Sequence, residues 1–188
     1  VVVDGERIAG VKHCELGDGK GPDILPGFVD AHIQIESSMI VPSRFAHIAV
    51  THGTIGVIAD PHEIGNVMGI EGIDYMIRSS NEALFNFCFG APSCVPAVGG
   101  EIETNGAVLN ADDIEQLMQR EDIGFLAEMM NYPGVLGGDK DVMRKIEAAR
   151  RNGKPVDGHA LGLKGDQRAQ YAAAGITTDH ECSTLDEG

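Results

Sequence analysis

From residue 24 onward, short apolar runs alternate with segments in which apolar residues recur at helical spacing. A short apolar run bounded by turn residues is typical of a buried strand, and the helical spacing is typical of a helix that packs on one face. Strands are predicted at residues 28–35, 54–60, 87–95, 123–130, 155–160 and 176–181. Helices are predicted between them at residues 42–52, 69–84, 111–120, 139–152 and 166–174. This alternation predicts an α/β fold with a parallel sheet.

Local signals mark several of these helix boundaries. Asn110 precedes Asp112 and Asp113, which is typical of a helix N-terminus with a polar cap and an acidic first turn. Gly153 and Gly175 stand where a helix is expected to end, because glycine adopts the left-handed conformation that closes many helices.

The chain before the alternating region has a different pattern. Residues 1–3 and 8–11 are rich in apolar residues and flank an Asp4-Gly5 pair, which predicts two short strands around a tight turn. We expect residues 1–24 to be part of a small β-sandwich domain and residues 25–188 to be the first six β/α units of a hydrolase barrel. Because six strands do not close an eight-stranded barrel, the chain is expected to be truncated.

The barrel itself is predicted from the polar residues at the strand ends. In a β/α barrel the carboxyl ends of the strands meet at one face, and that face carries the active site. An open doubly wound sheet also gathers its strand ends, but no GxGxxG motif follows the first strand, which favours the barrel. The polar strand-end residues are His32, Gln34 and Glu36; Asp60, His62 and Glu63; Glu128; Asp157 and His159; and Asp179, His180 and Glu181.

Composition excludes some partners. With 14 basic and 29 acidic residues the net charge is −15, which disfavours nucleic-acid polymers and anionic membrane surfaces but suits a small molecule and a cation. No apolar run reaches the roughly 18 residues of a membrane span. The cysteines form no CxxC pair, so Cys14, Cys88, Cys94 and Cys182 are expected to be reduced, buried thiols, which favours a cytoplasmic protein.

Four strand-end residues could together bind a metal ion, namely His32, Glu128, His159 and His180. His32 and Gln34 alternate along the first strand and are expected to share a side, with Glu36 continuing the row. Glu128 would cost several kcal/mol to bury without a partner, so a cation is favoured beside it. His159 and His180 end the next two strands, and such a mixture of imidazole and carboxylate suits zinc, iron or manganese. The alternative is that each residue makes separate hydrogen bonds at the barrel mouth.

This arrangement resembles the amidohydrolase superfamily. The barrel of that superfamily carries HxH on strand 1, a bridging carboxylate on strand 4, single histidines on strands 5 and 6, and an aspartate on strand 8. Gln34 departs from this pattern because it stands where the second histidine belongs, and a strand-8 aspartate would lie beyond Gly188. Within the superfamily the sequence is most similar to the adenine deaminases, in residues 26–32, 35–39, 59–64, 93–96, 127–135, 157–159 and 179–181.

The resemblance implies a function. It implies hydrolytic deamination of adenine to hypoxanthine and ammonia by a metal-activated water, as a step of purine salvage. It also implies a divalent transition metal, manganese, iron or zinc, with two ions in the full-length enzyme, and a homo-oligomer. The implied metal ligands are His32, Gln34, Glu128, His159 and His180.

Further residues receive candidate roles. Proton transfer is assigned to Glu128, Glu36, His62, Glu63 and Glu181, although the last four could instead orient the metal histidines. Candidate adenine contacts are Ser37, Ser38 and Tyr132, although the serines could instead cap the following helix and Tyr132 could be a loop residue without function.

Two other functions remain open at this point. Another amidohydrolase, acting on a cyclic amide or an acetylated amino sugar, would use the same scaffold with a different pocket. A metal-poor, non-catalytic relative would account for Gln34. Without a strand-8 aspartate, this chain alone is expected to be inactive.

Overall fold

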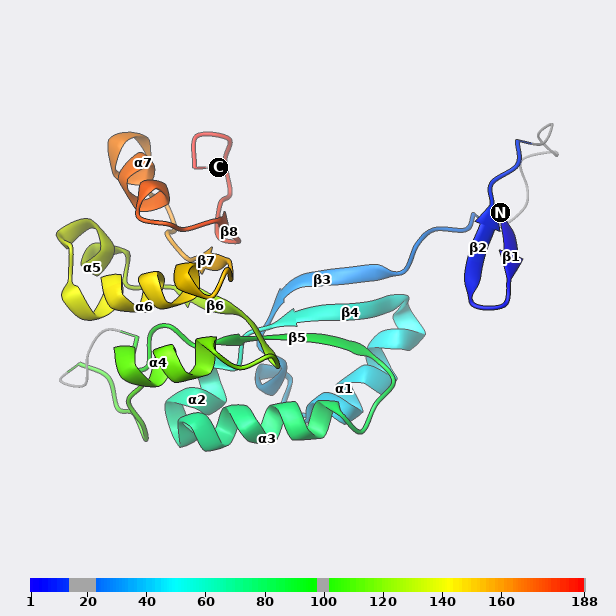
Figure 1. Cartoon of the computed structure of the whole chain (residues 1–188), viewed down its shortest axis with the longest axis horizontal. Helices are drawn as coiled ribbons and strands as arrows, with labels where there is room; N and C mark the ends of the chain where they lie inside the picture. The colour runs from blue at the N-terminus through cyan, green and yellow to red at the C-terminus, as the bar shows by residue number, and fades with distance from the viewer. Residues whose placement is uncertain (14–22, 98–101, 188) are drawn as a thin grey trace.

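The computed structural model describes residues 1–13, 23–97 and 102–187. Its centre is a six-stranded sheet in which each strand pairs in parallel with the next one along the chain, in the order β3-β4-β5-β6-β7-β8. Figure 1 shows this sheet as a curved layer, which is the arc of an incomplete TIM-type barrel. The strands are β3 (Phe28–Ile33), β4 (Thr54–Ala59), β5 (Asn86–Ala91), β6 (Ile123–Met129), β7 (Val156–Gly158) and β8 (Thr178–Asp179).

The helices connect successive strands, as the alternation predicts. Helices α2 and α5 were not expected, because they are short and follow directly after a strand, where the apolar pattern has no room to repeat. The 3-10 turns are η1 (Ile35–Ser38) and η2 (Val50–His52). The α-helices are α1 (Pro42–Ala49), α2 (His62–Met68), α3 (Ile70–Ser80), α4 (Ala111–Met118), α5 (Tyr132–Gly137), α6 (Lys140–Arg151) and α7 (Gly165–Ala173).

The predicted helix boundaries are confirmed where a cap defines them. The Asn110 side chain accepts hydrogen bonds from the backbone of Asp112 and Asp113, and the Asp113 carboxylate accepts one from the Asn110 backbone, so α4 begins with a reciprocal capping box. Gly153 and Gly175 follow α6 and α7 with φ angles of 66° and 117°, which side chains with a Cβ adopt only with strain. These residues therefore set where the helices stop.

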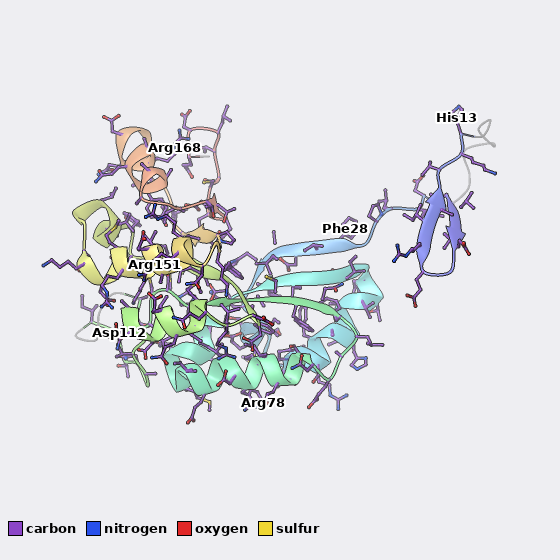
Figure 2. The ribbon with its side chains drawn as sticks, in the orientation of Figure 1. His13, Phe28, Arg78, Asp112, Arg151 and Arg168 are labelled. Carbon is purple, nitrogen blue, oxygen red and sulfur yellow. The ribbon has the colours of Figure 1, made fainter. Side chains whose placement is uncertain are left out.

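The hydrophobic core lies between the sheet and its helices. Ile73 of α3, Ile114 of α4 and Leu126 of β6 are completely buried in it. Strand β6 is buried at almost every position, as expected for a central parallel strand covered on both faces. The opposite, amino end of β3 is different, since Phe28 lies at the surface and is 60% exposed (Figure 2).

All six strands of the sheet end before their predicted last residue, and β3 and β5 show the reason most clearly. Strand β3 stops at Ile33, and the chain then turns into η1, so the expected continuation of the strand row to Glu36 is wrong. Strand β5 stops at Ala91 because Pro92, which follows, has no N–H for a ladder hydrogen bond.

The amino-terminal strands form the predicted hairpin. Strand β1 (Val2–Asp4) pairs antiparallel with β2 (Arg7–Gly10), and Figure 1 shows the pair standing apart from the curved sheet. The larger β-sandwich domain expected over residues 1–24 remains a prediction.

The cysteine prediction holds in part. Cys88, Cys94 and Cys182 are free thiols, and Cys14 lies outside the described residues. Cys182 is exposed, so the expectation that every thiol is buried is wrong, because this residue falls in the segment after β8 that no helix covers. Within the described part of the chain, no helix has the length and apolar character needed to cross a membrane.

Candidate metal centre

A cavity of about 530 Å³ opens where the strands β3, β6, β7 and β8 end. Its volume falls within the usual range for small-molecule sites. All five predicted metal ligands line it, which confirms that the fold brings them together, although it does not test their role. These ligands are His32, Gln34, Glu128, His159 and His180.

Glu128 is the centre of this group. Its side chain is only 3% exposed, because β6 is buried at almost every position. One carboxylate oxygen, Oε2, lies 2.8 Å from His159 Nδ1, 3.3 Å from His180 Nε2 and 3.9 Å from His32 Nε2. The other oxygen, Oε1, accepts a 2.6 Å hydrogen bond from Gln34 Nε2. The carboxylate is therefore surrounded by four nitrogen atoms from three other strand ends, those of β3, β7 and β8.

Asp157 contacts two of the histidines, His180 and His32, through one carboxylate oxygen. Its Oδ2 lies 2.8 Å from His180 Nδ1 and 3.5 Å from His32 Nδ1, and its Oδ1 accepts a 2.7 Å hydrogen bond from Thr178. The His32 and His180 rings stack with centroids 3.6 Å apart. Burial alone would raise the pKa of Asp157, but its contacts with His32, Thr178 and His180 outweigh burial and lower it. The contact with Asp157 in turn raises the pKa of His32.

The donor set fits a divalent transition-metal ion. Three groups have ligand atoms within 4.8 Å of one another, namely Glu128 with His159 and His180, His32 with Asp157 and His180, and His32 with Asp60 and Glu128. One buried atom of these groups, Asp60 Oδ2, has no hydrogen-bond partner, and His32 Nδ1 has only the 3.5 Å contact with Asp157 Oδ2. Imidazole nitrogen and carboxylate oxygen are the ligands that zinc, iron and manganese accept, and an ion would satisfy the unpartnered oxygen.

Both ring nitrogens of His62 make polar contacts next to this group. Its Nδ1 lies 2.6 Å from Asp60 Oδ1, and its Nε2 accepts a 3.2 Å hydrogen bond from the Cys94 backbone N–H. Because Nε2 accepts, the proton of the neutral ring sits on Nδ1. Burial lowers the pKa of His62, but the neighbouring Asp60 charge outweighs this and raises it. His62 is therefore placed to orient its neighbours.

The loop after β5 is tied to the cavity floor and to an outer helix. Ser93 Oγ donates a 2.7 Å hydrogen bond to the Glu128 carbonyl. The buried Lys145 of α6 donates from Nζ to the carbonyls of Ser93 at 3.0 Å and Leu109 at 2.8 Å, and so holds both ends of the loop. Cys94 and Glu103 of this loop line the cavity.

The other predicted site residues divide into two groups. Ser37, His62, Glu63 and Glu181 line the cavity. The remaining candidates turn away from it, so their assigned roles stay predictions without support from the cavity lining. Glu36 Oε1 accepts a 3.0 Å hydrogen bond from the Ile64 backbone, and burial raises the pKa of Glu36. Ser38 donates to Ile35 O at 2.5 Å, and Tyr132 begins α5 and packs on the core.

Neither serine caps the helix that follows. Val41 is the N-cap residue of α1 and provides no side-chain hydrogen bond, so the capping interpretation is wrong. The separate turn η1 intervenes between the serines and α1, which removes them from the capping position.

Sequence reasoning missed several residues of the site. Asp60 and Asp157 were recognised as polar strand ends, but they were not assigned to the metal centre. Asp157 stands two residues before His159 on β7, and this spacing was a usable signal because alternate strand residues share a side. Asn66 and Glu103 also line the cavity, from α2 and from the loop after β5, and no sequence spacing indicated this.

Comparisons with known proteins identify a family and several relatives of this chain. A model described as "Amidohydrolase family" matches residues 24–188. A protein named adenine deaminase from Salinibacter ruber is 56% identical over 164 residues, covering 87% of this chain and 30% of that protein. Adenine deaminases from Parabacteroides distasonis and Borreliella burgdorferi are each 54% identical, covering 94% and 87% of this chain and 32% and 30% of those proteins. The chain thus spans about a third of the length of these curated relatives.

Proposed function

The chain belongs to the amidohydrolase family, and on that premise we propose that its cavity serves the hydrolytic deamination of adenine to hypoxanthine and ammonia. One observation carries the proposal. A buried Glu128 carboxylate stands within 2.8–3.9 Å of three histidines that come from three other strand ends. The names of the relatives support adenine as the substrate.

The metal ligands are assigned from this geometry. Glu128, His159 and His180 would hold one ion, and His32 and Gln34 are the further candidates for a second. When bound, a divalent transition-metal ion supplies the activation of water near neutral pH. Manganese, iron and zinc all accept this mixture of imidazole and carboxylate ligands.

Proton transfer falls to the acidic residues at the cavity wall. The amine of adenine leaves poorly unless it is protonated, so an acid must face the ring. Glu181 lines the cavity, with Oε1 3.9 Å from His180 Nε2 and 4.0 Å from His159 Nδ1. Glu63 lines it from the first turn of α2. These two carboxyl groups are better placed for the task than Glu36 and His62, whose polar atoms already bind the surrounding chain.

The wall also favours a neutral substrate. Glu63, Glu103 and Glu181 line the cavity together with Glu128, and none of the described residues that line it is a lysine or arginine. Such a wall repels anionic rings such as dihydroorotate, whereas adenine is uncharged. Ser37 lies among the lining residues and can donate a hydrogen bond to a purine nitrogen.

The cellular setting of this activity belongs to the same proposal. Deamination of adenine suits purine salvage in the cytoplasm, carried out by a homo-oligomer without a nucleic-acid or membrane partner. The net charge of −15 supports the exclusion of polyanionic partners.

The test is an assay of the complete protein that carries this chain. After loading with manganese, iron or zinc, the protein should release ammonia from adenine and form hypoxanthine. Turnover of hydantoin or dihydroorotate without any release from adenine would support the alternative amidohydrolase activity. Absence of stoichiometric metal together with absence of turnover would support the non-catalytic relative.

A further inference from the structure

We propose that Asp60 is a metal ligand of this chain and forms a second cation position with His32 and Glu128. The inference rests on the proposed function only in requiring that the cavity holds metal. It assigns to Asp60 the place next to His32 that Gln34 is chemically unsuited to fill.

Asp60 is a fully buried carboxylate with one unused oxygen. The residue is 0% exposed, at the end of β4. Its Oδ1 contacts His62 Nδ1 at 2.6 Å, whereas Oδ2 is buried without any hydrogen-bond partner. A buried carboxylate oxygen without a hydrogen-bond partner lowers the stability of the fold unless a cation lies beside it.

The other two ligands stand close to the Asp60 carboxylate. Ligand atoms of His32, Asp60 and Glu128 lie within 4.8 Å of one another. His32 turns Nε2 toward Glu128, 3.9 Å from its Oε2, while Nδ1 faces Asp157 Oδ2 at 3.5 Å. The three residues come from neighbouring or facing strands of one sheet, so their separation is set by rigid backbone.

Gln34 makes a contact that points away from a ligand role. Its Nε2 donates to Glu128 Oε1 at 2.6 Å, and an amide nitrogen has no lone pair to offer a cation. Asp157, the other nearby carboxylate, is committed, since Thr178 binds one of its oxygens and His180 the other. Of the carboxylates grouped with His32, Asp60 is therefore the one that keeps an oxygen without a hydrogen-bond partner.

The test measures metal content in the complete protein. Manganese is titrated into metal-free protein, free ions are followed by electron paramagnetic resonance, and bound ions are counted by elemental analysis after dialysis. Wild type should bind two ions per chain. Asp60→Asn should retain one and weaken the second at least about tenfold. Gln34→Ala should retain both.

Two controls separate ligation from damage to the fold. Asp179→Asn alters another strand-end carboxylate, whose oxygens accept backbone hydrogen bonds from Ala160 and Glu181, and it should leave both ions in place. His62→Asn removes the hydrogen-bond partner of Asp60 and should also keep two ions. If His62→Asn loses the second ion as Asp60→Asn does, the effect passes through His62 and the proposal is overturned.

A rescue experiment completes the design. Adding Gln34→His to Asp60→Asn should restore the second ion, because a new imidazole beside His32 supplies the missing ligand; failure of this rescue in a folded double variant contradicts the proposal. Unchanged second-ion affinity in Asp60→Asn, or a single ion in wild type, overturns the assignment of Asp60 alone. A wild-type protein that binds no metal would contradict the proposed function itself.

Discussion

The metal centre has two halves, which differ in how completely their polar atoms are hydrogen-bonded in the absence of an ion. The late half, from β6 to β8, contains Glu128, Asp157, His159 and His180, and its carboxylates contact histidines at 2.8–3.3 Å. The early half, from β3 and β4, contains His32, Gln34 and Asp60. It holds an amide in place of an imidazole, and the buried Asp60 Oδ2 has no hydrogen-bond partner.

The difference separates two ways of building a binding site. The late half is held by its own hydrogen bonds, so its ligands are oriented before a cation arrives. The early half contains a polar atom whose burial is compensated only when something binds. We therefore expect the late half to determine whether metal binds at all, and the early half to determine how many ions bind.

Removing a late-half ligand should have the largest effect. In the complete protein, His159→Ala should abolish stoichiometric metal binding and lower adenine turnover by more than about 100-fold, since even residues outside the ligand shell often cost 10–100-fold. Elemental analysis and an ammonia assay measure both. The exposed Arg144→Ala on α6 is the control and should change neither. Retention of full metal content in His159→Ala would show that the late half does not hold the ion.

Removing an early-half ligand should have a smaller effect. His32→Ala should lose one ion and keep the other, because Glu128, His159 and His180 remain as a separate group. Manganese titration should show one binding step instead of two. Loss of both ions together would mean that the two halves act as one unit.

Restoring the missing imidazole should strengthen the early half. Gln34→His is expected to tighten binding of the weaker ion about tenfold or to raise turnover, since imidazole is a better transition-metal ligand than an amide. The same titration measures it. If metal content and turnover both stay unchanged, residue 34 does not contact the metal.

The backbone of the late half can be weakened without touching a ligand. The buried Tyr171 hydroxyl donates to Met129 O at 2.8 Å and accepts from the His159 N–H at 3.2 Å. Tyr171→Phe should lower the free energy of unfolding by about 1–2 kcal/mol, because both backbone groups lose their partner. Thermal unfolding measures this. The half-exposed Tyr75→Phe is the matched control, and an equal loss there would refute the explanation.

A pH effect outside both halves should be smallest. The hydrogen bond from Arg120 lowers the pKa of Asp122, so the pair stabilises the fold above the ordinary carboxyl pKa of about 3.9 and loses this effect as the pH falls through it. Asp122 is 45% exposed, so the contribution should stay below about 0.5 kcal/mol. The difference in unfolding temperature between wild type and Asp122→Asn should shrink below about pH 4; a constant difference would exclude the ion pair as its cause.

The sequence predicted the late half better than the early half for a physical reason. Glu128, His159 and His180 lie on or next to strands whose apolar pattern fixes their place at the barrel mouth. Glu36 was placed wrongly because the chain leaves the extended conformation at η1, which the apolar run through Ile35 does not reveal. Period-two reasoning applies only as far as the strand continues.

The surroundings of Asp60 could not be predicted from residue spacing along the chain. Its position at a strand end was visible, but it was not grouped with the predicted metal ligands. Its unpartnered oxygen became evident only once His32 of β3 and Glu128 of β6 stood beside it. Contacts between residues so distant in sequence are decided by the curvature of the sheet.

Lys145 links the outer helix α6 to the loop that forms part of the cavity wall. From the outer helix α6, its ammonium group holds both ends of the loop that supplies Cys94 and Glu103 to the cavity wall. The metal ligands of β3, β7 and β8 do not depend on this contact. A substitution of Lys145 would therefore shift Cys94 and Glu103 in the cavity wall without removing a direct contact of His32, His159 or His180.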